Sequence, residues 1–557
     1  MEPLPEAPLP LPNDAPHLLE RLAAEQPGQR IQTSVRQALQ RQTQALVNRY
    51  AREYSSNHIY NLAAIVADVE TGEVLAYAGN ATYPADERQG NQVDIITSPR
   101  STGSILKPFL YAGMLHDGLL LPSMLVSDVP LNINGFSPHN YNKTFYGAVP
   151  AHVAIERSLN VPLVRMLSQY NTGRFMSLLK SWGMTTLRFS EEHYGASLIL
   201  GGAEGTLWDL SGMYASMSRV LKHYRTYNGR YNPADIHPLT PFPAERKEPA
   251  ERKEPIRSLT DSRLTDKALL SSAALWYTFE AMSALNRPEE EADWQQFESM
   301  KRIAWKTGTS YGGRDAWAIG TTPRYVVGVW AGNASGEGRP GLTGVGNAAP
   351  VLFDLFSLLP GGEWFDLPYD ETLPMAICRN SGHKASPYCE QTDTLYMPLS
   401  GNNTGICPYH KLVHLSADGR YRVNSSCESV DRMISRPWFV LPPAQEYYYR
   451  NYHIDYIPLP PVKPGCGQDL NRQIELIYPE HNAILYLPKG FSGKSEKFIF
   501  KAAHARRDAT IYWHLDESYL GETTENHQIS CSVGQGKHLL TLIDNEGNQK
   551  KIQFEVK

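Results

Sequence analysis

The sequence predicts a multidomain α+β protein, in which an antiparallel sheet flanked by helices is followed by a cysteine-bearing segment and an all-β sandwich. Three observations support this prediction. The chain has 557 residues, which is too long for one hydrophobic core. β-type runs enclose a long, mostly helical stretch in residues 58–360. All six cysteines lie beyond residue 377, and short alternating runs fill the region after Cys466.

Residues 1–57 are predicted to be a linker region. Their start, MEPLPEAPLPLPNDAPH, is rich in proline, and residues 17–54 then show helical periodicity that is interrupted at Pro27 and Gly28. The next run, LAAIVADVETGEVLAYAG, is β-rich on both sides of the turn ETGE. This pattern is typical of a β-hairpin.

Residues 58–360 are predicted to form one domain. A mostly helical stretch reaches Tyr224, and another helix is expected at residues 268–285. RIAWKTGTS, DAWAIGTT and YVVGVWAGN then give three β-type runs joined by short turns, which favours an antiparallel meander. AERKEP occurs twice in tandem at residues 244–255, and its charge and proline content predict a solvated loop.

Residues 361–465 are predicted to be a cysteine-bearing connector. An even number of cysteines confined to one region is typical of a disulfide framework in an oxidising compartment. The candidates are Cys378, Cys389, Cys407, Cys427, Cys466 and Cys531. The alternative is a zinc site that uses the first three of these with His410, but their gaps lack the closely spaced first CxxC pair of zinc ribbons. We therefore favour disulfides and expect no metal.

Residues 466–557 are predicted to form a β-sandwich of the immunoglobulin type. QIELIYP, AILYLP, KFIFKA, TIYWHL, HLLTLID and KIQFEV are short alternating runs separated by turns. Trp513 is expected in the core, and Cys466 could pair with Cys531 across the ends of the domain. The preceding aromatic run at residues 446–461 is predicted to be an extended connector whose tyrosines pack against a neighbouring domain, with sugar binding as the alternative.

Charge and hydropathy argue against two classes of partner. The 53 basic and 58 acidic side chains give a net charge of −5, so we expect no nucleic-acid partner and no anionic membrane surface. No run of 18 apolar residues occurs, and the proline-rich start is unlike a secretory signal peptide. We therefore expect no membrane span and no export signal in the sequence as given.

Three short motifs occur in a defined order. STGSILKPF places Ser104 and Lys107 three residues apart, ERSLN supplies Ser158 and Asn160, and KTGTS begins at Lys306. On a helix, residues three apart share a face, so the Lys107 amine is expected to reach the Ser104 hydroxyl. The ordered set of three is far more specific than any one motif.

Two other Ser-x-x-Lys strings lie outside this order. Residues 177–180 follow the Ser-x-Asn motif, and residues 381–384 lie beyond Lys-Thr-Gly in the cysteine-bearing region. Both strings are expected to be surface segments without a catalytic role.

The residues of the first two motifs fit acyl transfer through a serine. Ser104 is the expected nucleophile, and Lys107 is the expected general base. Burial and a second cation, Lys306, would lower the pKa of Lys107 and leave its amine neutral enough to take a proton. Ser158 is expected to relay a proton to the leaving amine. Ser104 is predicted to lie in the first turn of its helix, where backbone NH groups point at it.

The Lys-Thr-Gly segment is predicted to be a strand that binds the substrate. Gly308 has no Cβ, so a peptide backbone could approach along the strand edge. Thr307 and Thr309 offer hydroxyls for a terminal carboxylate, and Asn160 would hold the substrate amide. The backbone NH groups of Ser104 and Thr309 are expected to form the oxyanion hole.

The ordered motifs are the signature of penicillin-binding proteins and serine β-lactamases. The chain resembles the class A, bifunctional penicillin-binding proteins in particular. FSPHNYNKTFYGAVPAHVAIERSLNVP, LGGAEGTLWDLSGMYA and KTGTSYGGRDAWAIGTTPRYVVGVWAGN look like their transpeptidase domain. The segment CRNSGHKASPYC…CPYH and the terminal sandwich look like the penicillin-binding protein 1C branch.

The resemblance implies a penicillin-binding transpeptidase fold and a peptidoglycan D,D-transpeptidase. Ser104 would form an acyl-enzyme with D-Ala-D-Ala stem peptides and pass it to an amine on a neighbouring stem, and β-lactams would acylate Ser104 as mimics. The resemblance also implies the periplasmic side of the inner membrane for the parent protein, envelope partners for the C-terminal domain, and no cofactor. The family's glycosyltransferase motif and membrane helix have no match in this sequence, so no glycosyltransferase activity is expected.

Three other functions stay open at this point. A D,D-carboxypeptidase would hand the same acyl-enzyme to water. A β-lactamase would need a deacylating base, and the nearby Glu156 is expected on a helix surface instead. A catalytically weak β-lactam-binding scaffold would recruit partners through its sandwich and its cysteine-bearing segment.

Overall fold

The structure is a computed structural model that describes residues 13–82, 89–131, 133, 136–244, 262–284, 302–466, 474–486, 497–506, 508–516, 518–545 and 548–557. The chain divides into two compact units. The first comprises Met1–His116, Ile155–Ser158 and Leu167–Thr372, and the second comprises Asp117–Ala154, Leu159–Met166 and Leu373–Lys557. Apart from Ala244, the tandem repeat at 244–255 lies outside the described residues.

The division differs from the predicted boundary at residue 360 because part of the first predicted domain packs with the cysteine-bearing segment. The backbone NH of Leu125 donates to the carbonyl of Ser381 at 2.8 Å. Leu121 shares a small buried cluster with Met375 and Met397. These contacts join segments that are far apart in the sequence, so local periodicity gives no sign of them.

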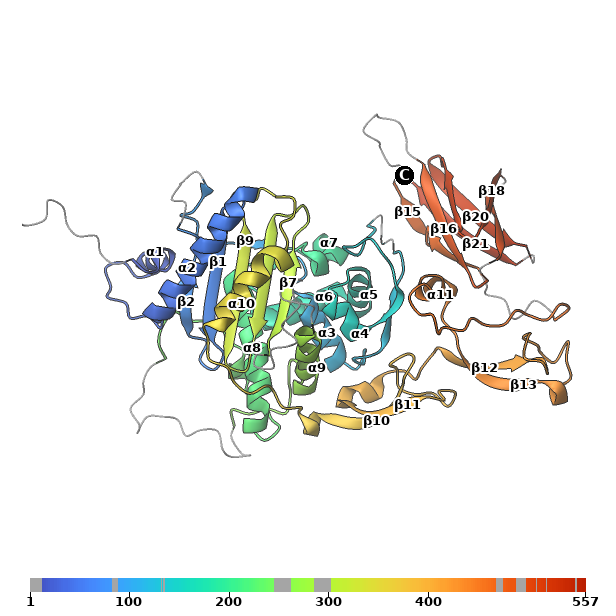
Figure 1. Cartoon of the computed structure of the whole chain (residues 1–557), viewed down its shortest axis with the longest axis horizontal. Helices are drawn as coiled ribbons and strands as arrows, with labels where there is room; N and C mark the ends of the chain where they lie inside the picture. Colours follow the sequence, from blue (N-terminus) through green and yellow to red (C-terminus); the bar gives the residue numbers. More distant parts are fainter. Residues whose placement is uncertain are drawn as a thin grey trace, which may run out of the picture. The chain divides into compact units, whose positions relative to one another are not determined.

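The first unit is built on a five-stranded antiparallel sheet in the order β2-β1-β9-β8-β7 (Figure 1). Its strands are β1 (Asn61–Asp68), β2 (Val74–Ala78), β7 (Ala304–Thr309), β8 (Asp315–Thr321) and β9 (Tyr325–Gly332). The predicted hairpin and the predicted meander are both confirmed. The pairing of β1 with β9 joins them into one sheet.

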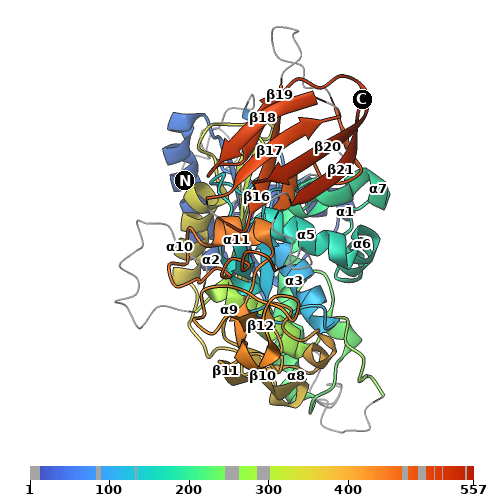
Figure 2. The same ribbon diagram turned by 90° about the vertical axis from the view of Figure 1, so that its right-hand side faces the viewer.

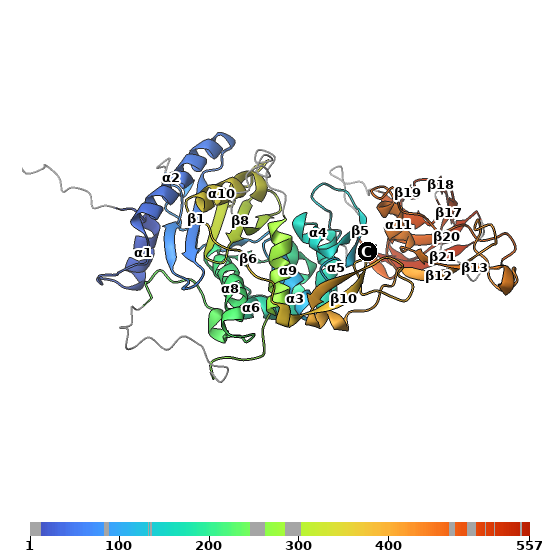
Figure 3. The same ribbon diagram turned by 60° about the horizontal axis from the view of Figure 1, so that its bottom comes forward.

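Helices cover both faces of this sheet, which explains why its strands are buried almost throughout (Figure 3). Helices α2 (Gln37–Tyr54) and α10 (Ala349–Ser357) pack on one face, and the long α8 (Leu207–Thr226) packs on the other. Helices α3 (Lys107–His116) and α9 (Ser272–Ser283) contact each other, and α9 confirms the helix expected at 268–285.

Several shorter helices and strands also occur before residue 206. They are α1 (Pro16–Glu25), β3 (Arg100–Ser101), α4 (Ala151–Glu156), α5 (Val161–Tyr170), α6 (Thr172–Ser181) and α7 (Glu191–Tyr194), and β6 (Glu204–Gly205) follows just after them. No helix among the described residues is long and apolar enough to cross a membrane.

The described part of the second unit contains three separate two-stranded ladders, and the first and third of these are antiparallel. They pair β4 (Leu125–Asp128) with β5 (Gly147–Pro150), β10 (Thr372–Cys378) with β11 (Thr392–Pro398), and β12 (His410–Leu415) with β13 (Ile434–Phe439). The prediction of an extended connector at 446–461 is wrong at its start, because α11 (Pro443–Tyr449) is helical. The helix places Tyr449 in a buried cluster of this unit.

The end of the second unit is a β-sandwich, as predicted (Figure 2). One sheet has the order β14-β16-β19, and the other has the order β15-β21-β20-β17-β18. The bounds are β14 (Ile474–Tyr478), β15 (Ala483–Leu485), β16 (Phe498–His504), β17 (Thr510–Leu515), β18 (Ser518–Thr524), β19 (Gln528–Cys531), β20 (Gly536–Asp544) and β21 (Gln549–Val556). Trp513 is fully buried in the core between the sheets, as expected.

The expected Cys466–Cys531 disulfide is wrong. Cys466 is bonded to Cys427, and Cys531 packs as a buried thiol among the apolar side chains of the sandwich core. Cys378, Cys389 and Cys407 are also free of disulfides. One of the predicted disulfide candidates therefore serves as a core residue, because a free cysteine packs as a small hydrophobic group.

Candidate active site

The sequence predicts Ser104 in the first turn of its helix. In the structure, Ser104 lies in a turn just before α3. Helix α3 begins at Lys107, whose backbone NH donates to the carbonyl of Ser104 at 3.3 Å. This bond gives the turn a helical pitch and keeps Ser104 and Lys107 one turn apart. The difference concerns only where the helix begins, and the predicted spacing of the two residues is preserved.

Two aromatic side chains that the sequence analysis did not single out fix this turn. Tyr214 of α8 donates its hydroxyl to the carbonyl of Ile105 at 2.8 Å. Trp317 of β8 donates its ring NH to the carbonyl of Ser101 at 2.7 Å. Both rings lie in segments that resemble the transpeptidase domain, LGGAEGTLWDLSGMYA and DAWAIGTT. Their residue type alone does not distinguish them from ordinary core aromatics.

Ser158 lies between two buried lysines. Lys306 donates its amine to the Ser158 hydroxyl at 2.7 Å and to the carbonyl of Thr307 at 2.9 Å. Lys107 donates to the carbonyl of Ser158 at 2.8 Å, and its Nζ lies 3.5 Å from the Ser158 hydroxyl. Folding therefore brings residues from all three motifs within hydrogen-bond distance of one another.

The burial of these amines changes their protonation. Neither Lys107 nor Lys306 has any exposed surface (0% for both). Burial lowers the pKa of Lys306 to about 7. Burial and, to a smaller extent, the charge of Lys306 lower the pKa of Lys107 well below its usual value. Both shifts favour the neutral form of the amine.

Ser158 has an unusual backbone conformation. It lies between α4 and α5, with φ of 51°, in the left-handed region that residues other than glycine rarely adopt. Such a conformation costs on the order of 1 kcal/mol and is held by its surroundings. Here it turns the carbonyl of Ser158 toward Lys107 and the hydroxyl toward Lys306.

Strand β7 lies directly against the Ser104 turn. A Cβ on Gly308 would stand 2.6 Å from the carbonyl oxygen of Thr102 and 3.3 Å from the backbone nitrogen of Ser104. A Cβ on Gly103 would stand 2.6 Å from the backbone nitrogen of Thr309. The two predicted oxyanion donors, the NH groups of Ser104 and Thr309, therefore come from backbones in close contact.

Strand β7 lies at the edge of the sheet. It is the last strand in the order, and among the described residues only β8 pairs with it. Thr307 is 7% exposed, so its hydroxyl is less accessible than the sequence analysis expected. The Thr309 hydroxyl is half-buried and accepts from the backbone NH of Gly344 at 3.0 Å.

Asn160 belongs to the second unit. Its side-chain amide donates to the carbonyl of His139 at 2.8 Å, and its backbone NH donates to the side chain of Asn140 at 2.9 Å. Asn140 also hydrogen-bonds both carboxylate oxygens of Asp128. The HNYN segment therefore positions Asn160, a role that the sequence did not reveal.

The two competing Ser-x-x-Lys strings have different surroundings. Ser177 is exposed on α6, as expected. The prediction for Ser381 is wrong, because this serine is fully buried and donates its hydroxyl to the sulfur of Cys407 at 3.1 Å. Ser381 lies in the turn between Cys378 and Cys389, and it is buried together with Cys407, whose sulfur it contacts.

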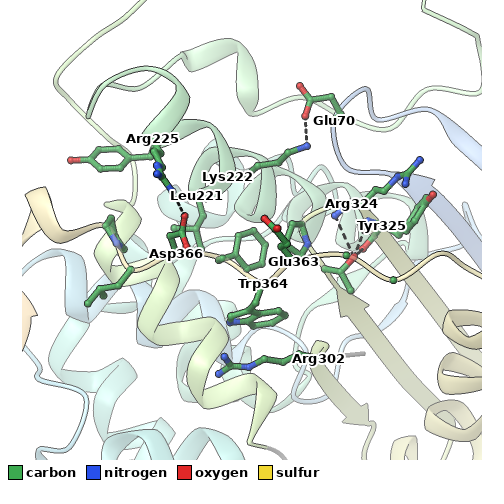
Figure 4. A pocket seen from close by; sticks show the side chains of 18 of the residues that line it. Glu70, Leu221, Lys222, Arg225, Arg302, Arg324, Tyr325, Glu363, Trp364 and Asp366 are labelled. Carbon is green, nitrogen blue, oxygen red and sulfur yellow. Dashed lines mark hydrogen bonds and ion pairs between the residues drawn. The ribbon is translucent and has the colours of Figure 1, made fainter. Parts of the chain in front are cut away.

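A large cavity of about 1110 Å³ in the first unit contains none of the motif residues (Figure 4). Its charged groups are largely satisfied by each other, since Lys222 pairs with Glu70 at 2.5 Å and Arg225 pairs with Asp366. Arg302 lies over the ring of Trp364. Among the described residues that line it, the cavity offers no pair of buried lysines comparable to the two at Ser158.

The lowered pKa of Lys306 has a consequence for stability. In the unfolded chain this lysine binds a proton up to about pH 10.5, whereas in the folded chain it does so only up to about pH 7. Folding therefore releases a proton between these values, and the cost of burying Lys306 decreases as the pH rises. A Lys306→Met variant should gain stability over the wild type at pH 6. The gain should shrink by about 1.4 kcal/mol per pH unit between pH 7 and 10.

Urea unfolding of both chains at pH 6, 8 and 9.5 checks this prediction. The exposed Lys180→Met serves as the control for removal of one positive charge. A stability difference between Lys306→Met and the wild type that is flat or grows with pH would contradict the lowered pKa.

Two protein families match separate parts of the chain. Residues 62–210 match the penicillin binding protein transpeptidase domain, and residues 463–554 match the Penicillin-Binding Protein C-terminus Family. The first match contains Ser104, Lys107 and Ser158 but ends before Lys306. The second covers the β-sandwich.

Similar proteins cover different shares of the chain. Penicillin-binding protein 1C of Escherichia coli (strain K12) is 26% identical over 99% of this chain and 68% of its own length. Penicillin-binding protein 1A of Rickettsia felis is 25% identical over 53% of this chain, and the match spans 38% of that relative. Among solved structures, the penicillin-binding protein PonA1 from Mycobacterium tuberculosis aligns with a TM-score of 0.47 and 19% identity, covering 68% of this chain and 99% of that one.

Proposed function

We propose that the chain is a serine-type D,D-transpeptidase that acts on peptidoglycan stem peptides, because residues 62–210 match the penicillin binding protein transpeptidase domain. The observation that carries this proposal is the meeting of Lys107 and Lys306 at Ser158, beside the turn that holds Ser104. A packed core has no need for two buried amines, since each is costly to desolvate.

In the proposed reaction, the Ser104 hydroxyl attacks the carbonyl carbon between the two D-alanines. Lys107 takes the serine proton, and the NH groups of Ser104 and Thr309 stabilise the oxyanion. The C–N bond then breaks, Ser158 gives a proton to the leaving amine of the terminal D-Ala, and Lys306 holds the terminal carboxylate. An amine of a second stem peptide attacks the seryl ester, which frees Ser104 and completes the cross-link.

The structure of the site supports a base at Lys107 in particular. Its pKa is lowered well below the usual value, which favours the neutral amine that a base needs. After it takes the serine proton, its contact with Ser158 offers a path by which that proton reaches the leaving group. Asn160, Thr307 and Thr309 keep the substrate-binding roles that the motifs suggest.

Incubation of the chain with penicillin, followed by intact mass measurement and peptide mapping, tests the proposal. We expect one penicilloyl group per chain, on the peptide that contains Ser104, and no adduct on Ser104→Ala. An unmodified chain, or an adduct on another residue, would refute the acyl-enzyme proposal. A rapidly lost adduct would instead indicate a β-lactamase.

A second measurement identifies the acceptor of the acyl group, which is either an amine or water. A pentapeptide that ends in D-Ala-D-Ala, supplied with and without an excess of a D-amino acid, separates transfer to an amine from transfer to water. We expect the exchanged peptide to exceed the hydrolysed tetrapeptide. Hydrolysis alone would assign the chain as a D,D-carboxypeptidase.

A further inference from the structure

Three cysteines and one histidine of the second unit meet at a single point. The sulfurs of Cys378, Cys389 and Cys407 and a ring nitrogen of His410 all lie within 4.8 Å of one another. We call these four residues the Cys3His cluster. Cys378 ends β10 and His410 begins β12, while the other two cysteines lie in the loops that precede and follow β11. The cluster therefore connects three separate segments of a region with little other regular structure.

The distances within the cluster fit a metal-centred tetrahedron. The Nδ1 atom of His410 lies 3.4 Å from the sulfur of Cys378, 3.5 Å from that of Cys389 and 3.4 Å from that of Cys407. A tetrahedral zinc ion with Zn–S bonds of about 2.3 Å and a Zn–N bond of about 2.0 Å places sulfur and nitrogen about 3.5 Å apart. All three distances agree with this value.

Hydrogen bonds alone do not explain this arrangement. A ring nitrogen carries either one hydrogen or one lone pair, so Nδ1 of His410 can form a good hydrogen bond with only one sulfur at a time. A disulfide does not explain it either, because three cysteines leave one unpaired and the disulfide formed in this region joins Cys427 to Cys466. A single cation at the centre would satisfy all four atoms.

Neighbouring donors stabilise sulfurs in the thiolate form. The Ser381 hydroxyl donates to the sulfur of Cys407 at 3.1 Å. The backbone NH of Ser386 donates to the sulfur of Cys389 at 3.3 Å. Hydrogen bonds of this kind orient the ligands of a metal and tune their charge. They also account for the buried Ser381, which is not part of the transpeptidase motifs.

The segment around the cluster contains little regular sheet. Among the described strands, β10 pairs with β11 and β12 pairs with β13, and each pair forms a separate two-stranded ladder. The faces of β11, β12 and β13 are mostly exposed or half-exposed. Two-stranded ladders are marginally stable in water, and small regions of this kind depend on disulfides or metals.

We propose that the Cys3His cluster binds one structural Zn²⁺ ion. Three thiolates and an imidazole in a closed tetrahedron are the ligands and geometry of structural zinc sites, in which no position is left for a substrate. The ion holds the end of β10, the loops beside β11 and the start of β12 together. This proposal replaces two predictions from the sequence. One was that the chain binds no metal, and the other was that Cys378, Cys389 and Cys407 form disulfides.

Metal analysis of the full chain tests the proposal. We expect about one zinc per chain after purification, released when a mercurial reagent modifies the thiols. Replacement of zinc by Co²⁺ should give the thiolate charge-transfer and strong visible bands of a tetrahedral sulfur-rich site. A chain that binds less than about one-tenth of an equivalent of zinc, even after reduction in the presence of zinc, would overturn the proposal.

Matched variants separate ligands from other cysteines. Cys389→Ser should lose most of the zinc, whereas Cys531→Ser should retain it, since Cys531 lies in the sandwich core. Because the first variant could unfold, His410→Cys provides a second test. It should keep zinc and shift the cobalt spectrum toward that of four sulfur ligands, and an unchanged spectrum would exclude His410 as a ligand.

Discussion

Replacing Lys107 by methionine is expected to slow the acylation of Ser104 by penicillin about 1,000-fold, within the usual range for loss of a general base. Methionine has nearly the length of lysine and is apolar, so it should fill the buried space without a charge. The Ser104 turn and β7 should stay in place, because Tyr214 and Trp317 hold the turn through its backbone. The measurement is the second-order rate constant for adduct formation, followed by mass or by a fluorescent penicillin.

The second Ser-x-x-Lys string supplies a matched control for this variant. Lys180 follows Ser177 with the same spacing but is exposed on α6, so Lys180→Met should be acylated at the wild-type rate. The unfolding temperature of Lys107→Met should equal or exceed that of the wild type, because removing a buried amine relieves a desolvation cost. Acylation of Lys107→Met within threefold of the wild type would show that Lys107 is not the base.

Local patterns predicted the elements of the first unit better than their pairing. The hairpin around ETGE and the three runs from β7 to β9 follow from alternation and turn residues, and each is present. The β1–β9 pairing joins Asn61 to Gly332. A contact over that separation depends on the packing of the whole unit, and no short segment encodes it.

The motif residues were predicted as a set, but their geometry was not. The order of the motifs indicated that Lys107, Ser158 and Lys306 would meet. The left-handed conformation of Ser158 was not foreseen, because serine has no preference for it and only the surrounding fold imposes it.

The cysteine-bearing segment shows where spacing misled the interpretation. The segment contains no CxxC pair, but CPYH places Cys407 and His410 at the same close spacing, with histidine in the second position. That signal was available in the sequence. The pairing of Cys427 with Cys466 could not be predicted from the sequence, because six cysteines allow many connectivities.

A side chain at Gly308 is expected to damage the site as severely as loss of the base. A Cβ there would stand 2.6 Å from the carbonyl oxygen of Thr102 and 2.9 Å from the side chain of Ile105. Backbone atoms cannot yield as a flexible side chain does, so β7 must move away from the Ser104 turn. That movement separates the NH groups of Ser104 and Thr309, and losing one oxyanion donor costs about 100- to 1,000-fold in rate.

We therefore expect Gly308→Val to be acylated by penicillin about 1,000-fold more slowly than the wild type, and Gly308→Ala to show a smaller loss in the same direction. Gly362→Val is the matched control, since a Cβ on Gly362 meets no atom within 4 Å. It should keep the wild-type rate. Thermal unfolding of each variant separates a local shift of β7 from loss of the fold. A folded Gly308→Val chain with the wild-type acylation rate would mean that contact between β7 and the Ser104 turn is not needed for the reaction.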